Sequence, residues 1–473
     1  MPDFTLEDQE EYYLRKSTTY EERKEYKRLY VRPPVETVDP MEITQDQIIV
    51  GFKTEDYRRD NVVVINAGKF APNGIVNSFQ AAVVGPNGSG KSGIMSILGL
   101  DTAVARWKEP LYGNDLKGES VKHGEPFGTD MESDDLARID DISESLGIRR
   151  RAYENILICP RISKDIPTDA IPFSIGWPTI ARIAAHNRDI ATHMVCGLSG
   201  IFPDSSPILM NMLKVVLKDA ETMGKWTRFR DDLEAYATKK GRLESAKLML
   251  DSIDFKLDDD TITDKEKYQV DVLRLMKDRQ GKGGVYFKSN MLSGVKETII
   301  DLPTNTMFAA HLWEIYYDCE DWAIRRDPNA ILKSDNGAYI DLDEVTRFAK
   351  EDYESTTRGL IADFLRKARA SRVDVCVGAQ QIQEVYRGVT AEIKRWFTSQ
   401  VLEGNRAKFK KMRLTEDELN TLGALRRESV QTSMNTNVSE WAEVDGRDAS
   451  AEITYFDPIW PLSQIQKSRK LSM

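Results

Sequence analysis

A glycine-rich octapeptide carries the clearest chemistry in the sequence: Gly85-Pro86-Asn87-Gly88-Ser89-Gly90-Lys91-Ser92. It fits the pattern G-x-x-x-x-G-K-[ST] at every position. Glycine lets backbone N–H groups turn inward around phosphate oxygens, where a Cβ would interfere. In this pattern Lys91 reaches the β- and γ-phosphates, and the Ser92 hydroxyl is a Mg²⁺ ligand. The octapeptide therefore predicts a site for ATP and Mg²⁺.

The residues around the octapeptide fit that chemistry. The apolar run Ala81–Val84 ends abruptly at Gly85, as a buried parallel strand does when it stops at a phosphate site. Residues 93–98 are expected to form a helix whose N-terminus faces the anion. A strand, a loop and a helix in this order predict a phosphate cradle rather than a chance glycine-rich turn.

A second candidate group is the acidic pair that follows the apolar stretch 337–342. We expect Asp343 to hold Mg²⁺ through water and Glu344 to polarise the attacking water. Asp341 is an alternative for the metal, because the strand could end earlier. An Asp-Glu pair alone often marks the solvated start of a helix, but a P-loop upstream favours the catalytic interpretation.

A third strand, expected over residues 373–378, leads to Gln380. An amide at the tip of a strand beside the P-loop can contact the γ-phosphate or the attacking water, although a polar strand end that faces solvent fits the pattern nearly as well. The basic segment before this strand contains Arg369. It is a candidate arginine finger for a neighbouring subunit, or part of a solvated basic face. Alternatives for that arginine are Arg366, Arg372 and Arg406.

The order of these motifs resembles the HerA/FtsK clade of P-loop ATPases, which includes archaeal HerA translocases, conjugation ATPases and viral genome-packaging ATPases. The resemblance covers roughly residues 45–465 and is clearest over residues 297–400. It places the Walker B carboxylates on Asp343 and Glu344, the sensor on Gln380 and the family's arginine on Arg369. Ala368 stands where a glycine is usual, and Ala379 where a Ser or Thr often precedes the glutamine.

The resemblance implies a homo-oligomer, a hexameric ring with DNA in its central channel and ATP hydrolysed between subunits. A nuclease or another accessory protein is a further partner that it suggests. Only about 75 residues precede the P-loop strand, which is short for the complete β-barrel of HerA proteins.

Composition limits the partners and the compartment. The net charge of −10, from 66 Lys+Arg and 76 Asp+Glu, argues against a chain coated in basic surface but not against a narrow basic channel. The cluster at 408–413 is a candidate DNA contact, or a solvated charge run. Four scattered cysteines indicate neither a zinc site nor a disulfide framework. With no run of about 18 apolar residues and an acidic N-terminus, we expect a cytoplasmic protein without membrane insertion.

Strand-like and helix-like runs alternate along the chain, which predicts an α/β fold with a mostly parallel sheet. We expect a RecA-like P-loop ATPase core at 45–105 and 285–465, and a largely helical insertion at 106–284. A charged N-terminal arm at 1–44 and a tail at 466–473 complete the chain. Further strands are expected at 47–52, 61–65, 284–287 and 297–302, and helices at 178–198, 206–218, 227–251 and 264–277.

Other ATPase classes account less well for the sequence. ABC-type and SMC-like ATPases favour the same P-loop wording but need an LSGGQ-type signature, and the stretches 198–201 and 292–295 lack its second glycine and its glutamine. No long heptad run supports an SMC arm. The region after residue 400 holds no two-metal acidic constellation of a nuclease. A switch-type ATPase would use the same motifs, so that alternative stays open.

Overall fold

The computed structural model describes residues 43–53, 61–86, 88–115, 123–128, 133–161, 166–203, 206–219, 226–253, 271–288, 301–351, 356–401, 403–425, 427–431, 437–447 and 451–464. The charged arm expected at 1–44 and the tail at 466–473 lie almost entirely outside these ranges.

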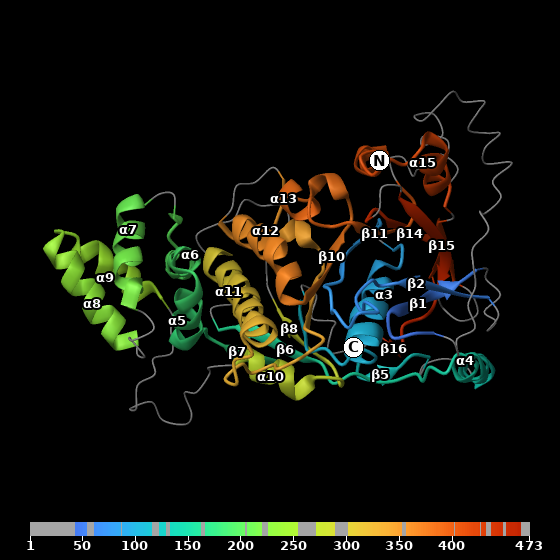
Figure 1. The fold of residues 1–473 in the computed structure, drawn as a ribbon, viewed down its shortest axis with the longest axis horizontal. Coiled ribbons are helices and arrows are strands. Elements are labelled where there is room, and N and C mark those ends of the chain that lie inside the picture. The colour runs from blue at the N-terminus through green and yellow to red at the C-terminus, as the bar shows by residue number, and fades with distance from the viewer. Residues whose placement is uncertain are drawn as a thin grey trace, which may run out of the picture.

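A 12-stranded sheet organises the molecule, in the order β2-β1-β15-β14-β11-β3-β10-β9-β4-β8-β6-β7 (Figure 1). The eight strands from β11 to β7 run parallel to their neighbours. Their bounds are Arg395–Thr398 for β11, Gln80–Val84 for β3, Val373–Ala379 for β10, Ala338–Leu342 for β9, Leu111–Asn114 for β4, Gly284–Phe287 for β8, Ile156–Pro160 for β6 and Ala170–Phe173 for β7. The predicted α/β fold with a mostly parallel sheet is confirmed.

Four antiparallel strands extend the sheet beyond β11. They are β1 (Gln47–Phe52), β2 (Val62–Asn66), β14 (Trp441–Asp445) and β15 (Glu452–Pro458). Two short pairs lie apart from the main sheet: β12 (Arg427–Gln431) with β13 (Asn437–Ser439), and β5 (Glu125–Pro126) with β16 (Ser463–Gln464).

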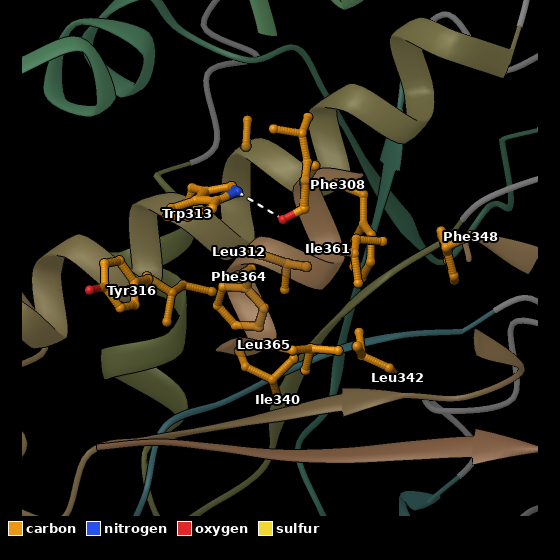
Figure 2. Packing of buried hydrophobic residues seen from close by; sticks show 14 of the residues in the cluster. Phe308, Leu312, Trp313, Tyr316, Ile340, Leu342, Phe348, Ile361, Phe364 and Leu365 are labelled. Carbon is orange, nitrogen blue, oxygen red and sulfur yellow. Dashed lines mark hydrogen bonds between the residues drawn. The ribbon is translucent and has the colours of Figure 1, made fainter. Parts of the chain in front are cut away.

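Helices cover both faces of the parallel strands. On one face α11 (Asp301–Glu320) and α12 (Thr356–Ala368) pack over alternate residues of β9, Ile340 and Leu342. Figure 2 shows these two side chains beneath Leu312, Phe364 and Leu365, with the Trp313 indole donating to the Leu360 carbonyl over 3.2 Å. On the other face lies α3 (Lys91–Ser96), continued by the π-helical η3 (Ile97–Val104). Because side chains alternate along a strand, Tyr339 and Asp341 of β9 point to that second face.

The remaining helices flank this core. The helices α5 (Trp177–His186), α6 (Arg188–Leu198), α7 (Pro207–Val216), α8 (Trp226–Lys239) and α9 (Leu243–Ser252) form a lobe at one end of the molecule, drawn in green in Figure 1. Others are α4 (Ser133–Ser145), α10 (Val272–Arg279), α13 (Arg387–Thr390), α14 (Glu403–Lys410) and α15 (Glu416–Gly423). Short 3-10 helices are η6 (Leu217–Asp219), η9 (Val345–Arg347), η10 (Arg369–Ser371) and η11 (Ile382–Glu384), and the π-helical η8 (Asp321–Arg325) continues α11.

Most predicted elements are present, with some corrections. The helix expected at 227–251 is two helices, α8 and α9, separated by a turn at Gly241, whose backbone is left-handed. The helix expected at 178–198 is two helices, since Asn187 is extended and caps α6 by accepting from the Asp189 and Ile190 amides. The strand expected at 297–302 is wrong at its described end, because Asp301 and Leu302 begin α11. An acidic residue followed by Pro303 suits the first turn of a helix. Residues 297–300 and the first half of the helix expected at 264–277 lie outside the described ranges, and the second half of that helix is α10.

The stretch 106–284 contributes more than helices. Its strands β4, β6 and β7 join the main sheet, and β4 pairs directly with β9. The sheet therefore continues past residue 105, where the predicted core was divided; the domain boundaries themselves stay a prediction. Among the described residues, no helix combines the length and apolar character needed to cross a membrane.

Candidate nucleotide-binding site

The P-loop lies where β3 ends, between two strands that end at the same edge. Val84 pairs with Ala379 of β10 on one side and with Thr398 of β11 on the other. The Gly85 amide donates to the Ala379 carbonyl over 3.3 Å. Parallel strands present their carboxyl ends at one edge, where α/β proteins bind ligands. The loop is thus anchored to the strand that leads to Gln380.

Two glycines of the loop have left-handed backbones. Gly88 has φ 78° and Gly90 φ 87°, values that an L side chain rarely adopts. Gly90 is also the N-cap of α3, and the first helical residues, Lys91 and Ser92, follow it directly. Ser89 is buried, and its backbone N–H donates to the Pro86 carbonyl over 3.2 Å. Asn87 lies outside the described residues.

Lys91 and Asp343 meet across the site. The Lys91 ammonium lies 3.3 Å from Asp343 Oδ1, with side chains 10% and 34% exposed. The Asn114 amide, at the end of β4, donates to the Asp343 carbonyl over 2.8 Å. Gly378 of β10 leaves room for this carboxylate, since a Cβ there would come within 2.6 Å of Asp343 Oδ1. The P-loop lysine and the predicted Walker B aspartate are therefore brought together.

Asp341 lies on the same face as Asp343 but in a different environment. Its Oδ1 is buried and accepts no hydrogen bond in the described part of the chain. Burial, reinforced by Asp343 and Asp115, raises the pKa of Asp341 well above its ordinary value, and Lys91 only partly opposes this. Asp343, which is 34% exposed and lies against Lys91, is the more accessible metal ligand of the two.

Glu344 is held by contacts on three sides. Its backbone is left-handed, with φ 50°, and its amide donates to Asp343 Oδ1 over 2.8 Å. The Gln380 amide donates to Glu344 Oε1 over 3.3 Å, and Arg347 Nε lies 3.5 Å from Oε2. A non-glycine residue in this conformation costs of order 1 kcal/mol and is often found at functional sites. The local fold thus fixes the direction of the carboxylate that we assigned to water activation.

The arginines proposed for a neighbouring site lie elsewhere. Arg369 is exposed in η10, just before β10 begins, whereas Gln380 follows the last residue of that strand. Seven strand residues span about 20 Å. Arg369 is therefore at the opposite edge of the sheet from the P-loop of its own subunit.

The alternative arginines are engaged locally. Arg366 pairs with Asp363, Arg372 donates to the Asp335 carbonyl, and Arg406 pairs with Glu416. Each contact supports a structural role for that side chain. Arg366 and Arg369 are both exposed, and Arg369 is the one on which the sequence resemblance places the family's arginine.

The basic cluster at 408–413 is partly structural. Phe409 is buried, Lys410 pairs with Glu416, and the Lys408 ammonium donates to the Thr390 carbonyl over 3.1 Å. Burial, with Lys411 and Lys394 nearby, lowers the pKa of Lys408. Lys411 and Arg413 are exposed.

Sequence reasoning missed several residues of the site. Arg347 could have been found, since it follows Glu344 at one-turn spacing, but that spacing is common. Asn114 could not, because strand β4 was not predicted. Trp441 also contacts the site, donating to the Ser89 carbonyl over 3.0 Å across 352 residues of sequence. No local pattern signals such a contact.

The oxygen groups of the site suit Mg²⁺. No group of three or more His, Cys, Asp or Glu side chains is arranged for a metal ion in the part of the chain that the structure describes. Mg²⁺ usually binds through one or two carboxylates together with substrate phosphates, rather than in an all-protein cage. The Asp343 carboxylate and the exposed Ser92 hydroxyl fit that mode.

Comparisons with known proteins give remote likenesses. No model of a known protein family matches the sequence, and no curated protein matches it. Solved structures similar to the chain include VirB4 of Thermoanaerobacter pseudethanolicus, at 12% identity and a TM-score of 0.48, covering 87% of this chain and 96% of that one. Another is the genome-packaging NTPase B204 of Sulfolobus turreted icosahedral virus 2 in complex with sulfate, at 12% identity, a TM-score of 0.25 and 42% and 79% coverage. A third is the pCW3 conjugation coupling protein TcpA with ATPγS, at 9% identity, a TM-score of 0.30 and 91% and 71% coverage.

Genome-packaging and conjugation proteins are kinds that the sequence resemblance also names. At these identities and TM-scores the likenesses carry no conclusion about activity, which depends on the geometry of the site.

Proposed function

We propose that this protein is an ATP hydrolase that uses Mg²⁺ and acts as a DNA translocase. The observation that carries the proposal is the meeting of three motifs at one edge of the sheet. Lys91 contacts Asp343, and Glu344 contacts Gln380, so the P-loop, the acidic pair and the strand-tip amide form one constellation. These are the parts that phosphoryl transfer requires for binding, water activation and sensing.

Each residue has a distinct task in this mechanism. The loop amides and Lys91 hold the phosphates, and bound Mg²⁺ would neutralise charge that develops on them. Glu344 accepts a proton from water as the water oxygen attacks the γ-phosphorus. The bond from that phosphorus to the bridging oxygen breaks, leaving ADP and phosphate. Gln380 orients the water and releases Glu344 when the γ-phosphate is present.

We further propose that the active form is a homo-oligomeric ring, a hexamer, with sites between subunits. The position of Arg369 supports this, because it is exposed at the edge of the sheet remote from its own P-loop. In a ring that edge would face the nucleotide of the next subunit, where the guanidinium would stabilise charge on the transferred phosphoryl. DNA in the channel would be contacted mainly through its phosphates, so its binding would weaken with salt.

The test is the ATPase rate per subunit against protein concentration, with and without double-stranded DNA, at low and moderate salt. A steep rise with concentration, and stimulation by DNA that salt removes, are expected. A Lys91→Ala variant should be inactive under all conditions. A rate independent of both concentration and DNA would exclude the ring translocase and leave a switch-type ATPase.

A further inference from the structure

Strand β14, the antiparallel strand next to β11, contacts the P-loop through the side chain of Trp441. Trp441 begins β14, which lies beside β11 (Figure 1), and its indole is fully buried. The indole N–H donates to the Ser89 carbonyl, with 3.0 Å between Nε1 and the oxygen. A residue of the C-terminal part of the chain thus contacts the backbone of the phosphate loop.

This contact falls on the peptide group that joins Ser89 to Gly90. In a trans peptide the carbonyl and the following N–H point to opposite sides of the chain. Because the Ser89 carbonyl points into the core toward Trp441, the Gly90 N–H points away from the core, to the open side of the loop. Backbone N–H groups on that side are the ones that bind phosphate in a glycine-rich loop.

The rest of Ser89 holds this peptide only weakly. Its hydroxyl is buried but makes no hydrogen bond within the described ranges, and its amide donates to Pro86 inside the same loop. The next residue, Gly90, has a left-handed backbone without a Cβ to restrict it. The Ser89–Gly90 peptide therefore needs an outside partner to stay in one orientation.

We propose that Trp441 is a positioning residue of the nucleotide site, which keeps the Gly90 N–H directed at the bound phosphate. The inference rests on the proposed function, since it requires phosphate in the loop. Its energetic logic is preorganisation: the correct peptide orientation exists before nucleotide arrives, so binding does not have to select it. The antiparallel edge of the sheet thereby becomes part of the nucleotide site.

The test separates the indole N–H from the bulk of the ring. Trp441→Phe removes the donor and keeps an aromatic side chain. Trp107→Phe is the matched control, because Trp107 is equally buried, packs in the same core and also donates to a backbone carbonyl over 3.0 Å, that of Gln45. Affinities for a non-hydrolysable ATP analogue with Mg²⁺ and for inorganic tripolyphosphate would be measured by calorimetry, with melting temperatures alongside.

Trp441→Phe should bind both ligands about tenfold more weakly. The reason is that the freed Ser89–Gly90 peptide no longer holds the Gly90 N–H in its hydrogen bond to the charged phosphate. Trp107→Phe should bind them with affinities within about twofold of the wild type, even if its melting temperature falls as much as that of Trp441→Phe. Unchanged affinity in folded Trp441→Phe, or an equal loss in Trp107→Phe, would overturn the inference. If Trp441→Phe does not fold, Trp441→Met fills the space with a flexible apolar side chain and is held to the same outcomes.

A Lys91→Ala control distinguishes a failure of the nucleotide site from a failure of the positioning role of Trp441. Failure of the wild type to bind the ATP analogue, or equal binding by Lys91→Ala, would refute the nucleotide site itself. Binding that requires Lys91 but does not respond to Trp441→Phe would refute the positioning role alone.

Discussion

The Gln380 side-chain amide donates to Glu344 Oε1 over 3.3 Å, which joins the residue after β10 to the second residue after β9. Two side chains 36 residues apart are neighbours because parallel strands β9 and β10 end at the same edge of the sheet. The contact links the group that would activate water to the group that would sense the γ-phosphate.

Glu344→Gln should abolish turnover while keeping nucleotide bound. The substitution keeps the size of the side chain but removes the proton acceptor, so kcat should fall at least about 100-fold. Single-turnover hydrolysis and the affinity for ATP would be measured together. Glu392→Gln is the control and should keep its activity, because Glu392 lies three residues before β11, at the end of that strand opposite the P-loop. Normal hydrolysis by Glu344→Gln would show that another group accepts the proton.

Gly378→Ala should damage the site through crowding. The added Cβ would lie 2.6 Å from both Asp343 Oδ1 and Met95 Sδ, and the carboxylate is the group that must keep its position. We expect a loss of kcat of about 10- to 100-fold, as for a misplacement near 1 Å, with overpacking of about 1–3 kcal/mol in the free energy of unfolding.

The matched control for this substitution is Gly93→Ala, two residues into α3. A Cβ at Gly93 meets no atom within 4 Å, and alanine favours a helix by about 0.5–1 kcal/mol. This variant should be active and slightly more stable. If both variants behave alike, Gly378 is not required for the approach of Asp343.

Arg369→Ala subunits should be inactive alone but active when mixed with inactive Lys91→Ala subunits. A Lys91→Ala subunit still donates Arg369, and an Arg369→Ala subunit still offers an intact P-loop. Random mixing at equal amounts would pair an intact loop with an intact arginine at about one quarter of the interfaces, so about a quarter of the wild-type rate should return.

Arg366→Ala, which loses only the pair with Asp363, is the control in this mixing experiment. It should stay active by itself. No recovery after subunits have exchanged would mean that Arg369 does not act between subunits.

Some features of the fold and of the candidate site follow from local patterns in the sequence, and others depend on contacts between distant segments. The P-loop, Asp343 and Gln380 could be predicted because each follows an apolar run that ends at a polar residue, a local pattern. Strand β4 could not, since a four-residue strand carries almost no periodic signal. The left-handed backbone of Glu344 and the contact of Trp441 with Ser89 depend on packing between distant segments, which one sequence does not encode locally.

Glu314→Gln should alter how stability depends on pH. Burial in α11, only partly opposed by Arg182, raises the pKa of Glu314 to about 7. The folded state therefore holds this proton more tightly than the unfolded chain does, and the free energy of unfolding falls as the pH rises from about 4.5 to about 7. Above pH 7 the full loss remains.

Glutamine stays neutral and keeps an oxygen to accept the Thr179 hydroxyl, which donates to Glu314 over 3.1 Å. The variant should match the wild type at pH 4 and melt at least about 2 °C higher at pH 8. Exposed Glu244→Gln serves as the control and should follow the wild type at both values. Parallel curves for Glu314→Gln and the wild type would place the titration elsewhere, for example at Asp101 or Glu443, whose pKa values are also raised to about 7.

The direction of β10 has a geometric consequence for assembly. It runs from the neighbourhood of Arg369 at one edge of the sheet to Gln380 at the other. If Arg369 at one edge contacts the nucleotide site at the opposite edge of the next copy, neighbouring copies meet through two different surfaces. Such a head-to-tail contact does not by itself limit the number of copies. The assembly closes into a ring when the rotation between adjacent copies divides a full circle, and otherwise it grows into a filament. The angle between adjacent subunits, rather than the strength of their contact, would then decide whether copies of this protein close into a ring or form a fibre.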